Sequence, residues 1–216
     1  MISSSPAVTI RQVAVSPMDN NVYLITSRVT GKQILIDAAN DPDEISSMIA
    51  SARDDGPVPE VDLIIATHSH ADHLGALATM VRRTGAPTAS GREDADAITG
   101  QTGIVMDRVL DHGDTIGVDG IELTVIGLRG HTPGSIALAY VEPGQVVHLF
   151  SGDSLFPGGV GNTNHDPVRF ASLFCDVSTR IFDVYPDSTV VHPGHGNPTT
   201  LGAERPHLGE WRSRGW

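Results

Sequence analysis

The stretch ATHSHADHLG, residues 66–75, places three histidines and an aspartate directly after an apolar run. These residues are His68, His70, Asp72 and His73. Imidazole and carboxylate groups are the usual protein ligands of zinc and related divalent metals. The first two could share one metal ion, and the last two could share a second. Since two ligands complete neither site, this interpretation requires further ligands later in the chain.

Three later turns each supply one more ligand-type side chain. The turns RGHTPGS, SGDSLF and HPGHG each follow a strand-like apolar run, and they carry His131, Asp153 and His195. Strand ends at one edge of a sheet are where open α/β architectures build their sites. The flanking glycines let the backbone turn sharply and approach a ligand closely. We therefore expect the two groups of ligands to meet in one dinuclear metal site.

The elements that must position these residues alternate between strands and helices. Apolar alternation and short apolar runs predict strands over 8–15, 22–26, 34–37, 61–66, 88–90, 115–118, 121–128, 136–141, 146–150 and 189–191. Helical spacing predicts helices from 42 to about 52, with Asp41 as its cap, and over 72–83, 93–98 and 167–185. Strands and helices in both halves indicate an α/β layered protein.

The composition narrows the classes of function. The 216 residues carry a formal net charge of −12, and apolar types make up 39% of them. This length suits one domain, 1–216. The negative charge argues against a nucleic-acid partner, whose phosphates attract clustered Lys and Arg. No run approaches the roughly 18 apolar residues of a membrane helix, and no secretory signal is evident.

The single cysteine, Cys175, excludes an internal disulfide, which fits a cytoplasmic protein. Cys175 itself is expected to be a small packed hydrophobe. We expect a small-molecule substrate, neither a nucleic acid nor a membrane as partner, and leave the oligomeric state open, with a dimer among the options.

Four motifs together resemble the metallo-β-lactamase superfamily. THSHADH, GHTPGS, SGD and PGHG occur in the superfamily's order, within a similarity that extends from DNNVYLI to GHGNPTTLGAER. The resemblance implies an α/β fold of αββα type, a four-layer sandwich with a dinuclear centre between the sheets. It also implies two divalent metal ions, zinc first, with iron or manganese as alternatives. By position, one metal would be held by His68, His70 and His131, the other by Asp72, His73 and His195, and both by Asp153.

Such a centre is suited to hydrolysis. Two metal ions about 3.5–4 Å apart can share a water and lower its pKa from 15.7 to near 7. The resulting hydroxide would attack an activated acyl bond, and Asp72 could orient it or relay its proton. The blocks DNNVYLI, SGDSLFPGG and PGHGNPTTLGAER look most like short relatives of hydroxyacylglutathione hydrolase (glyoxalase II), which implies a thioester. The glutathione-holding C-terminal region of those enzymes has no clear counterpart, since the only basic residues there are Arg205, Arg212 and Arg214, so the thiol is left open.

Other readings stay open. An iron-dependent persulfide dioxygenase would use two histidines and an aspartate from the same set. A lactone or other ester hydrolase of the superfamily is a further alternative. The β-lactamases usually lack an aspartate at the position of Asp153. A non-catalytic metal-binding module would be expected to lose ligands, whereas all seven are present.

The expected roles of several other residues follow from the strands, helices and motif turns beside them in the sequence. His148 and His192 lie in or beside strands and are expected to be structural, and the acidic run of Glu93, Asp94 and Asp96 is expected to be a solvated helix start. The residues expected to line the cleft because they adjoin motif turns are Met18, Asn20, Tyr23, Arg129, Phe156, Asn162 and His165.

Overall fold

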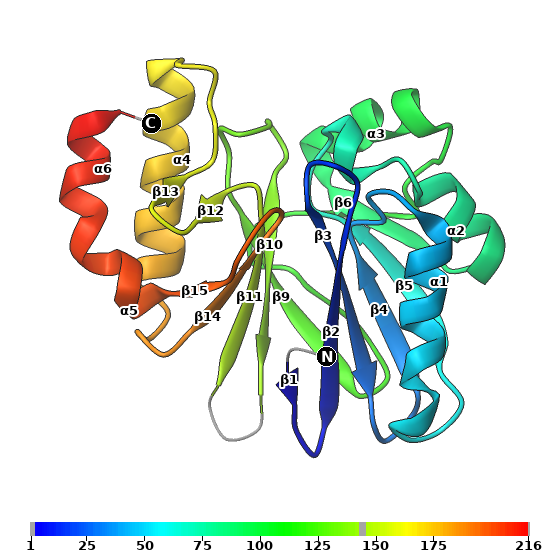
Figure 1. Ribbon diagram of the computed structural model, residues 1–216. Helices are drawn as coiled ribbons and strands as arrows, with labels where there is room; N and C mark the ends of the chain where they lie inside the picture. Colours follow the sequence, from blue (N-terminus) through cyan, green and yellow to red (C-terminus); the bar gives the residue numbers. More distant parts are fainter. Residues whose placement is uncertain (1–2, 143–145, 216) are drawn as a thin grey trace.

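Two β-sheets pack face to face, and helices cover the outer face of each, as Figure 1 shows for the computed structural model. The structure describes residues 3–142 and 146–215. Helices α1–α3 lie on one side of the sheets and α4–α6 on the other. The predicted α/β fold, the αββα sandwich, is confirmed.

The first sheet has seven strands in sequential order from β1 to β7. Strands β1 to β4 pair antiparallel, whereas β4, β5, β6 and β7 pair in parallel. The bounds are β1 Ser3–Ser4, β2 Val8–Val15, β3 Asn20–Ser27, β4 Lys32–Ile36, β5 Glu60–Ala66, β6 Thr88–Gly91 and β7 Arg108–Leu110.

The second sheet has the order β15-β14-β11-β10-β9-β8. Strands β11 and β14 are parallel, and β9, β10 and β11 pair antiparallel in turn. Strands β9, β11 and β14 therefore run in the same direction, so that the turns after all three lie at one edge. The bounds are β8 Thr115–Val118, β9 Ile121–Gly127, β10 Ile136–Val141, β11 Val147–Gly152, β14 Val190–Pro193 and β15 Thr199–Thr200, with a separate hairpin of β12 Leu155–Phe156 and β13 Gly159–Val160.

Two of the predicted helices are interrupted, whereas the one predicted over 93–98 lies further along the chain, at Ala95–Thr102. The segment expected as one helix over 72–83 is a 3-10 turn, Ala71–His73, followed later by α2, because the N–H of Ala76 donates to Ala38 at the end of the β4 region. The helix expected over 167–185 ends at Val177 and continues as a π-helical turn, Ser178–Phe182. The bounds are α1 Pro42–Ala50, α2 Leu77–Thr84, α3 Ala95–Thr102, α4 Pro167–Val177, α5 Leu201–Glu204 and α6 Leu208–Arg214.

Two local predictions were wrong. Asp41 precedes α1 but its side chain does not cap the helix; its carboxylate accepts a hydrogen bond from the N–H of Ser16 at 3.1 Å. Cys175 is exposed rather than packed, because the neighbouring Phe174 and Val177 turn the buried face of α4 toward the sheet. The C-terminal helices α5 and α6 were not anticipated; Trp211 of α6 is buried and lies edge-on to Phe182.

Three apolar layers follow from strand alternation, since successive side chains point to opposite faces. In β5, Leu63 and Ile65 pack between the two sheets, whereas Ile64 packs under α1–α3. In β11, Phe150 points into the layer between the sheets and Leu149 into the layer beneath α4–α6. In the described part of the chain, no helix has the length and apolar character that crossing a bilayer requires.

Candidate metal centre

The predicted ligands lie at the ends of β5, β9, β11 and β14. Strand β5 ends at Ala66, and the loop and 3-10 turn that follow carry the first four ligands. His131, Asp153 and His195 follow β9, β11 and β14, whose common direction brings the three turns to one edge (Figure 1). The hypothesis of convergent strand ends therefore matches the backbone topology.

Asp153 lies at the centre of four imidazoles. One carboxylate oxygen, Oδ2, lies 4.0, 3.6 and 3.4 Å from Nε2 of His68, His131 and His195. The other oxygen, Oδ1, lies 3.4 Å from Nε2 of His73. A single carboxylate thus faces ligands from both predicted halves, as a bridging ligand must.

The remaining ligands complete two groups around this carboxylate. Asp72 Oδ2 lies 3.3 Å from His195 Nε2 and 3.7 Å from His73 Nε2. His70 is exposed, and its ring centroid lies 4.4 Å from that of His131. The potential ligand atoms of each group lie within 4.8 Å of one another; we call these groups the first position, made of His68, His70, His131 and Asp153, and the second position, made of Asp72, His73 and His195.

Asp37 fixes two of the histidines through one buried hydrogen-bond network. Its carboxylate accepts from the N–H and the Oγ1–H of Thr67, both at 2.7 Å. Because the single Thr67 hydroxyl proton goes to Asp37, that oxygen must accept from Nδ1–H of His68, 3.0 Å away. Asp37 also lies 3.1 Å from Nδ1 of His73. Both rings therefore hold their proton on Nδ1 and present a bare Nε2 to the centre.

The other two buried or half-buried imidazoles are oriented by backbone oxygens. Nδ1 of His131 donates to the carbonyl of Asn162 at 2.8 Å, and Nδ1 of His195 donates to the carbonyl of Met18 at 2.8 Å. A metal-ligating histidine typically gives its other ring N–H to such an acceptor. All four rings thus have the tautomer that a metal ligand needs.

Several atoms at this centre are buried and lack a hydrogen-bond partner among the residues that the structure describes. They are Nε2 of His68, Nε2 of His131 and Oδ1 of Asp153. Burying unpaired polar atoms costs free energy unless something satisfies them. Bare imidazole nitrogens around a shared carboxylate have the donor chemistry for divalent metal ions. The histidine–aspartate clusters therefore fit a dinuclear metal site.

The charges differ between the two positions. Burial, reinforced by the neighbouring His73, holds the pKa of His68 well below its usual value, and burial also lowers the pKa of His131. Burial opposes the ionisation of Asp153, but the close imidazoles of His195 and His73 outweigh it and hold its pKa below the usual range. His195 has a raised pKa, chiefly through the nearby carboxylate of Asp153. Each position therefore contains one ionised carboxylate, Asp153 at the first and Asp72 at the second.

A buried aspartate joins the two loops of the first position. Asp94 was expected to be solvated, but it is only 1% exposed, and this expectation was wrong. Its carboxylate accepts from the N–H of Ser69 at 2.8 Å, from Oγ1 of Thr132 at 2.5 Å and from the N–H of Gly134 at 2.7 Å. Asp94 is enclosed because the loops of His68–His70 and His131 converge on it.

The second position is supported instead by the turn between β2 and β3. Asn20 is buried, and its Nδ2 donates to Asp72 Oδ2 at 2.8 Å. Met18 is 60% exposed, and it contributes the carbonyl that orients His195. Residues 16–20, which we call the hairpin tip, therefore orient two of the three ligands of the second position.

Glycine is required where the backbone passes closest to Asp153. A Cβ at Gly194 would lie 2.1 Å from Oδ1 of Asp153, and a Cβ at Gly161 would lie 1.7 Å from its carbonyl oxygen. Real Cβ atoms do not approach so closely. These two glycines let β14 and the β12–β13 hairpin close around the carboxylate.

The residues expected to line the cleft lie in different places in the structure. Tyr23 is only 3% exposed; it packs against Phe150 between the sheets, and its hydroxyl donates to the carbonyl of Pro193 at 2.7 Å. The expectation that it lines a cleft is corrected, because its strand position faces the second sheet. Asn20 and Met18 act on ligands, as described, and Asn162 does so through its backbone while its side chain is exposed.

Three of the residues expected to line the cleft, Phe156, Arg129 and His165, are partly or fully exposed at the surface of the protein. Phe156 is half-buried with its ring centroid 6.5 Å from that of His195. Arg129 lines an open hollow of about 720 Å³ that also has His70 and His131 in its wall. His165 is exposed just before α4 and is not part of that wall, although its neighbour Asn164 is.

His148 and His192 are structural, as expected. Both are buried; their rings stack with centroids 5.2 Å apart, and Nδ1 of His148 lies 2.9 Å from Nε2 of His192. His192 also stacks on Phe150. This aromatic stack joins β11 and β14 just before the turns that carry Asp153 and His195.

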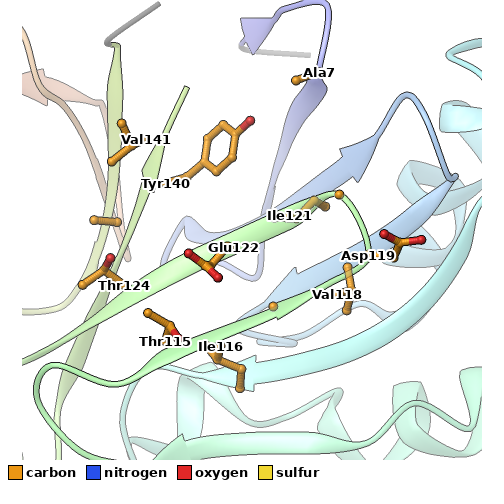
Figure 2. A pocket seen from close by; sticks show the side chains of 13 residues that line it. Ala7, Thr115, Ile116, Val118, Asp119, Ile121, Glu122, Thr124, Tyr140 and Val141 are labelled. Carbon is orange, nitrogen blue, oxygen red and sulfur yellow. The ribbon is translucent and has the colours of Figure 1, made fainter. Parts of the chain in front are cut away.

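A second large hollow, of about 730 Å³, lies away from the ligands. Figure 2 shows its wall, formed by β8 and β9 together with Tyr140 and Val141 of β10 and Ala7 near β2. Its carboxylates, Asp119 and Glu122, have no histidine beside them in that wall. We place the functional site at the predicted metal ligands, because the second hollow is large but its wall has no cluster of ligand-type side chains.

Sequence reasoning missed Asp37 and Asp94, which orient the ligands without being ligands. Asp37 immediately follows the apolar strand QILI, so the same rule of a polar residue after a strand could have indicated it. Asp94 offers no comparable local signal, because its partners Thr132 and Gly134 are far away in the sequence.

Comparison with known proteins agrees with this geometry. The family model of the metallo-beta-lactamase superfamily matches residues 15–211. A hydroxyacylglutathione hydrolase of Polaromonas sp. is 33% identical over 177 residues, which cover 80% of this chain and 60% of that protein. The hydroxyacylglutathione hydrolase GloC of Haemophilus influenzae is 28% identical over 166 residues, covering 68% of this chain and 76% of that one. The chain spans about 60% of the length of the Polaromonas enzyme.

Solved structures share the fold. ETHE1 from Myxococcus xanthus superposes with a TM-score of 0.77 at 24% identity, covering 95% of this chain and 85% of that one. TTHA1623, solved in a di-iron-bound form, has a TM-score of 0.68 at 30% identity, covering 90% and 96%. The family match over almost the whole chain and the histidine–aspartate metal site agree: this chain belongs to the metallo-β-lactamase superfamily.

Proposed function

We propose that the protein is a dinuclear metal-dependent hydrolase that cleaves a thioester of a small thiol. The observation that carries the proposal is that six ligand-type side chains gather in two groups around a seventh, the carboxylate of Asp153. Relatives named hydroxyacylglutathione hydrolase, at 33% and 28% identity, support a thioester as the bond. A relative solved in a di-iron-bound form supports two metal ions.

The residues of the centre would divide the work between holding metals and moving a proton. Divalent metals held there would lower the pKa of a water and polarise the thioester carbonyl. His68, His70 and His131 would hold one ion, His73 and His195 the other, and Asp153 would fix their separation. Asp72 would complete the second position.

Asp72 is also the residue best placed to take a proton. Its Oδ2 is engaged by Asn20 Nδ2 at 2.8 Å, which fixes the orientation of the carboxylate. The pKa of Asp72 is lowered: burial acts against this, but the bond from Asn20 and the nearby His73 outweigh it. The carboxylate is therefore ionised at neutral pH, and it would accept a proton from the attacking water.

The leaving group needs little help from the protein. A thiol has a pKa near 8.5, so a thiolate departs without a strong general acid. The amine released from an amide must be protonated as it leaves, which requires an acid beside the centre. The carboxylates of Asp72 and Asp153, however, are both held ionised. This favours thioesters over amides such as β-lactams.

A substrate panel on protein with a defined metal content tests the proposal. We expect hydrolysis of α-hydroxyacyl thioesters and much slower hydrolysis of lactones, β-lactams and phosphodiesters. His70→Ala should abolish thioester turnover, and His207→Ala, at an exposed site far from the ligand loops, should retain it. Oxygen consumption with a thiol persulfide, without thioester turnover, would instead identify a dioxygenase and overturn the proposal.

A further inference from the structure

The hollow beside the first position has a polar wall. It is about 720 Å³, and His70 and His131 of the metal centre form one side of it. Val168 and Pro133 are its only apolar side chains of any size. The rest of the wall is charged, polar or glycine: Ser69, Glu93, Gln101, Arg129, Gly130, Thr132, Asn164, Arg169 and Ser172. These residues offer hydrogen-bonding and charged groups to a polar part of the substrate.

Arg129 is held rigidly at the rim of this hollow. Its Nε and Nη2 donate to the two oxygens of Asp176 at 3.0 and 3.1 Å, and its backbone N–H donates to the same carboxylate. Asp176 is 5% exposed, whereas the Arg129 side chain is 56% exposed. Among the described residues, nothing hydrogen-bonds to Nη1 of Arg129. One face of a fixed guanidinium is therefore available to a ligand.

The positive charge of Arg129 is not cancelled by its partner. Asp176 also pairs with Arg180, whose Nη2 lies 3.2 Å from Oδ1. Two guanidinium groups thus share one carboxylate, and the group of three has a net charge of +1. A fork of parallel N–H donors is the geometry that binds carboxylates.

Glu93 gives the hollow a negative charge that opposes Arg129 and Arg169 in the same wall. It lines the same wall, is exposed, and makes no hydrogen bond or ion pair within the part of the chain that the structure describes. It lies close enough to act electrostatically on Arg129 without pairing with it. Since Glu93 is solvated, its repulsion of a bound anion is screened and should be smaller than the attraction by Arg129.

We propose that Arg129 binds a carboxylate of the substrate in this hollow, so that the enzyme selects thioesters whose thiol portion carries an acidic group. The inference rests on the proposed thioester hydrolysis and names the substrate class of that site. The carboxylate lies against Nη1 of Arg129, and the thioester extends past His131 toward the centre. Glu93 weakens the attraction and limits how tightly a simple acid is held.

Two matched thioesters test this selection. Both carry the same α-hydroxyacyl group, one on β-mercaptopropanoic acid and the other on its primary amide, so that they differ only in the charge. For the unchanged protein, we expect kcat/KM to be about 10- to 100-fold higher for the acid, as for a hydrogen bond to a charged group. Arg129→Gln should remove most of this ratio by raising KM for the acid, and Arg129→Lys should restore part of it.

Two further variants make the test specific. Glu93→Gln should raise the preference for the acid by about two- to fivefold, the range of an exposed charge pair. Arg92→Gln is the matched control, since Arg92 is bound to Asp111 and does not line this hollow. It should leave the ratio unchanged. Thermal melting of each variant checks that the fold is intact. We expect it to be, because Asp176 is still bound by Arg180 and by the backbone N–H of residue 129.

Binding separates this inference from the proposed function. Uncleavable thioethers of the same acid and amide should bind with the same preference in ligand-observed NMR, and Arg129→Gln should remove it. If no thioester is hydrolysed, the proposed function fails and the acid-thioester substrate class fails with it. If thioesters are hydrolysed but acid and amide are used and bound equally, or Arg129→Gln leaves their ratio unchanged, this inference alone is overturned.

Discussion

The two metal positions share Asp153 but are supported by different parts of the molecule. The first position depends on Asp94, a buried carboxylate that ties the loop of His68 and His70 to the loop of His131. The second position depends on the hairpin tip, which is exposed at Met18.

This difference predicts which of the two positions loses its metal ion more easily. A ligand set held by buried hydrogen bonds keeps its geometry because those bonds have no competition from water. A ligand set held by an exposed turn is open to local opening. We therefore expect the second position to lose its ion first when metal is withdrawn.

Replacing the shared ligand should have the largest effect. Asp153→Asn removes the charge that faces four imidazoles, so both positions should lose affinity together and thioester hydrolysis should fall to the rate of the metal-free protein. Metal content by mass spectrometry and the initial hydrolysis rate measure this. Asp187→Asn, an exposed site paired with Arg205, is the control and should behave as the unchanged protein. Retention of both ions by Asp153→Asn would contradict the shared-ligand arrangement.

The buried support of the first position comes next. In Asp94→Asn, the amide has one acceptor oxygen for three donors, so a buried donor is left unpaired at a cost of about 1–3 kcal/mol. The first position should lose about 10- to 100-fold in metal affinity, while the second changes much less. Competition titrations with a chelator, and chemical unfolding of the metal-free protein, measure the two effects. Asp96→Asn on α3, which is exposed, should show neither.

The hairpin tip should give a smaller effect at the other position. Asn20→Ala removes the bond to Asp72, which is 28% exposed, so water can replace part of what is lost. We expect about a tenfold loss of affinity at the second position and little change at the first. The same competition titration applies. If Asn20→Ala and Asp94→Asn weaken the same position, the two supports are not separate.

The aromatic stack of His148, His192 and Phe150 should affect metal binding least, and its effect is visible instead as a pH dependence of stability. Burial, with a further contribution from His148, lowers the pKa of His192 to about 3. Below pH 6.5, His192 of the unfolded chain, with a pKa near 6.5, binds a proton, whereas His192 of the folded chain stays neutral. The stability present above pH 6.5 is therefore lost as the pH falls toward 3. Between pH 7 and 5, this histidine should remove about 2 kcal/mol from the free energy of unfolding.

Chemical unfolding of the metal-free protein at several pH values measures this loss. His192→Gln should reduce the slope of this dependence between pH 6.5 and 4.5 by the contribution of one histidine, whereas His207→Gln, at an exposed site, should not. Equal slopes for the unchanged protein and His192→Gln would show that His192 takes up its proton without unfolding the stack.

The ligands could be predicted from the sequence because each follows a strand directly. His131, Asp153 and His195 stand in turns just after β9, β11 and β14, so local pattern and topology together locate them. The sandwich was implied by the resemblance of the four motifs to the superfamily, whereas apolar runs such as that of β5 predicted only an α/β layered protein.

The supports of the ligands could not be predicted in this way. Asp94 lies in an acidic run that looks solvated, and its burial arises only when loops distant in sequence close over it. Tyr23 was misplaced for a related reason, because the facing sheet, rather than its own strand, decides what covers it. The exposure of Cys175 likewise depends on which side of α4 meets the second sheet.

The central claim is that seven side chains hold two metal ions around Asp153. Anomalous diffraction from crystals grown with a single divalent metal tests it most directly. We predict two peaks per chain about 3.5–4 Å apart, one among Nε2 atoms of His68, His70 and His131 and the other beside Asp72, His73 and His195, each in contact with Asp153. A single peak at full metal loading, or peaks that leave Asp153 uncoordinated, would contradict the account.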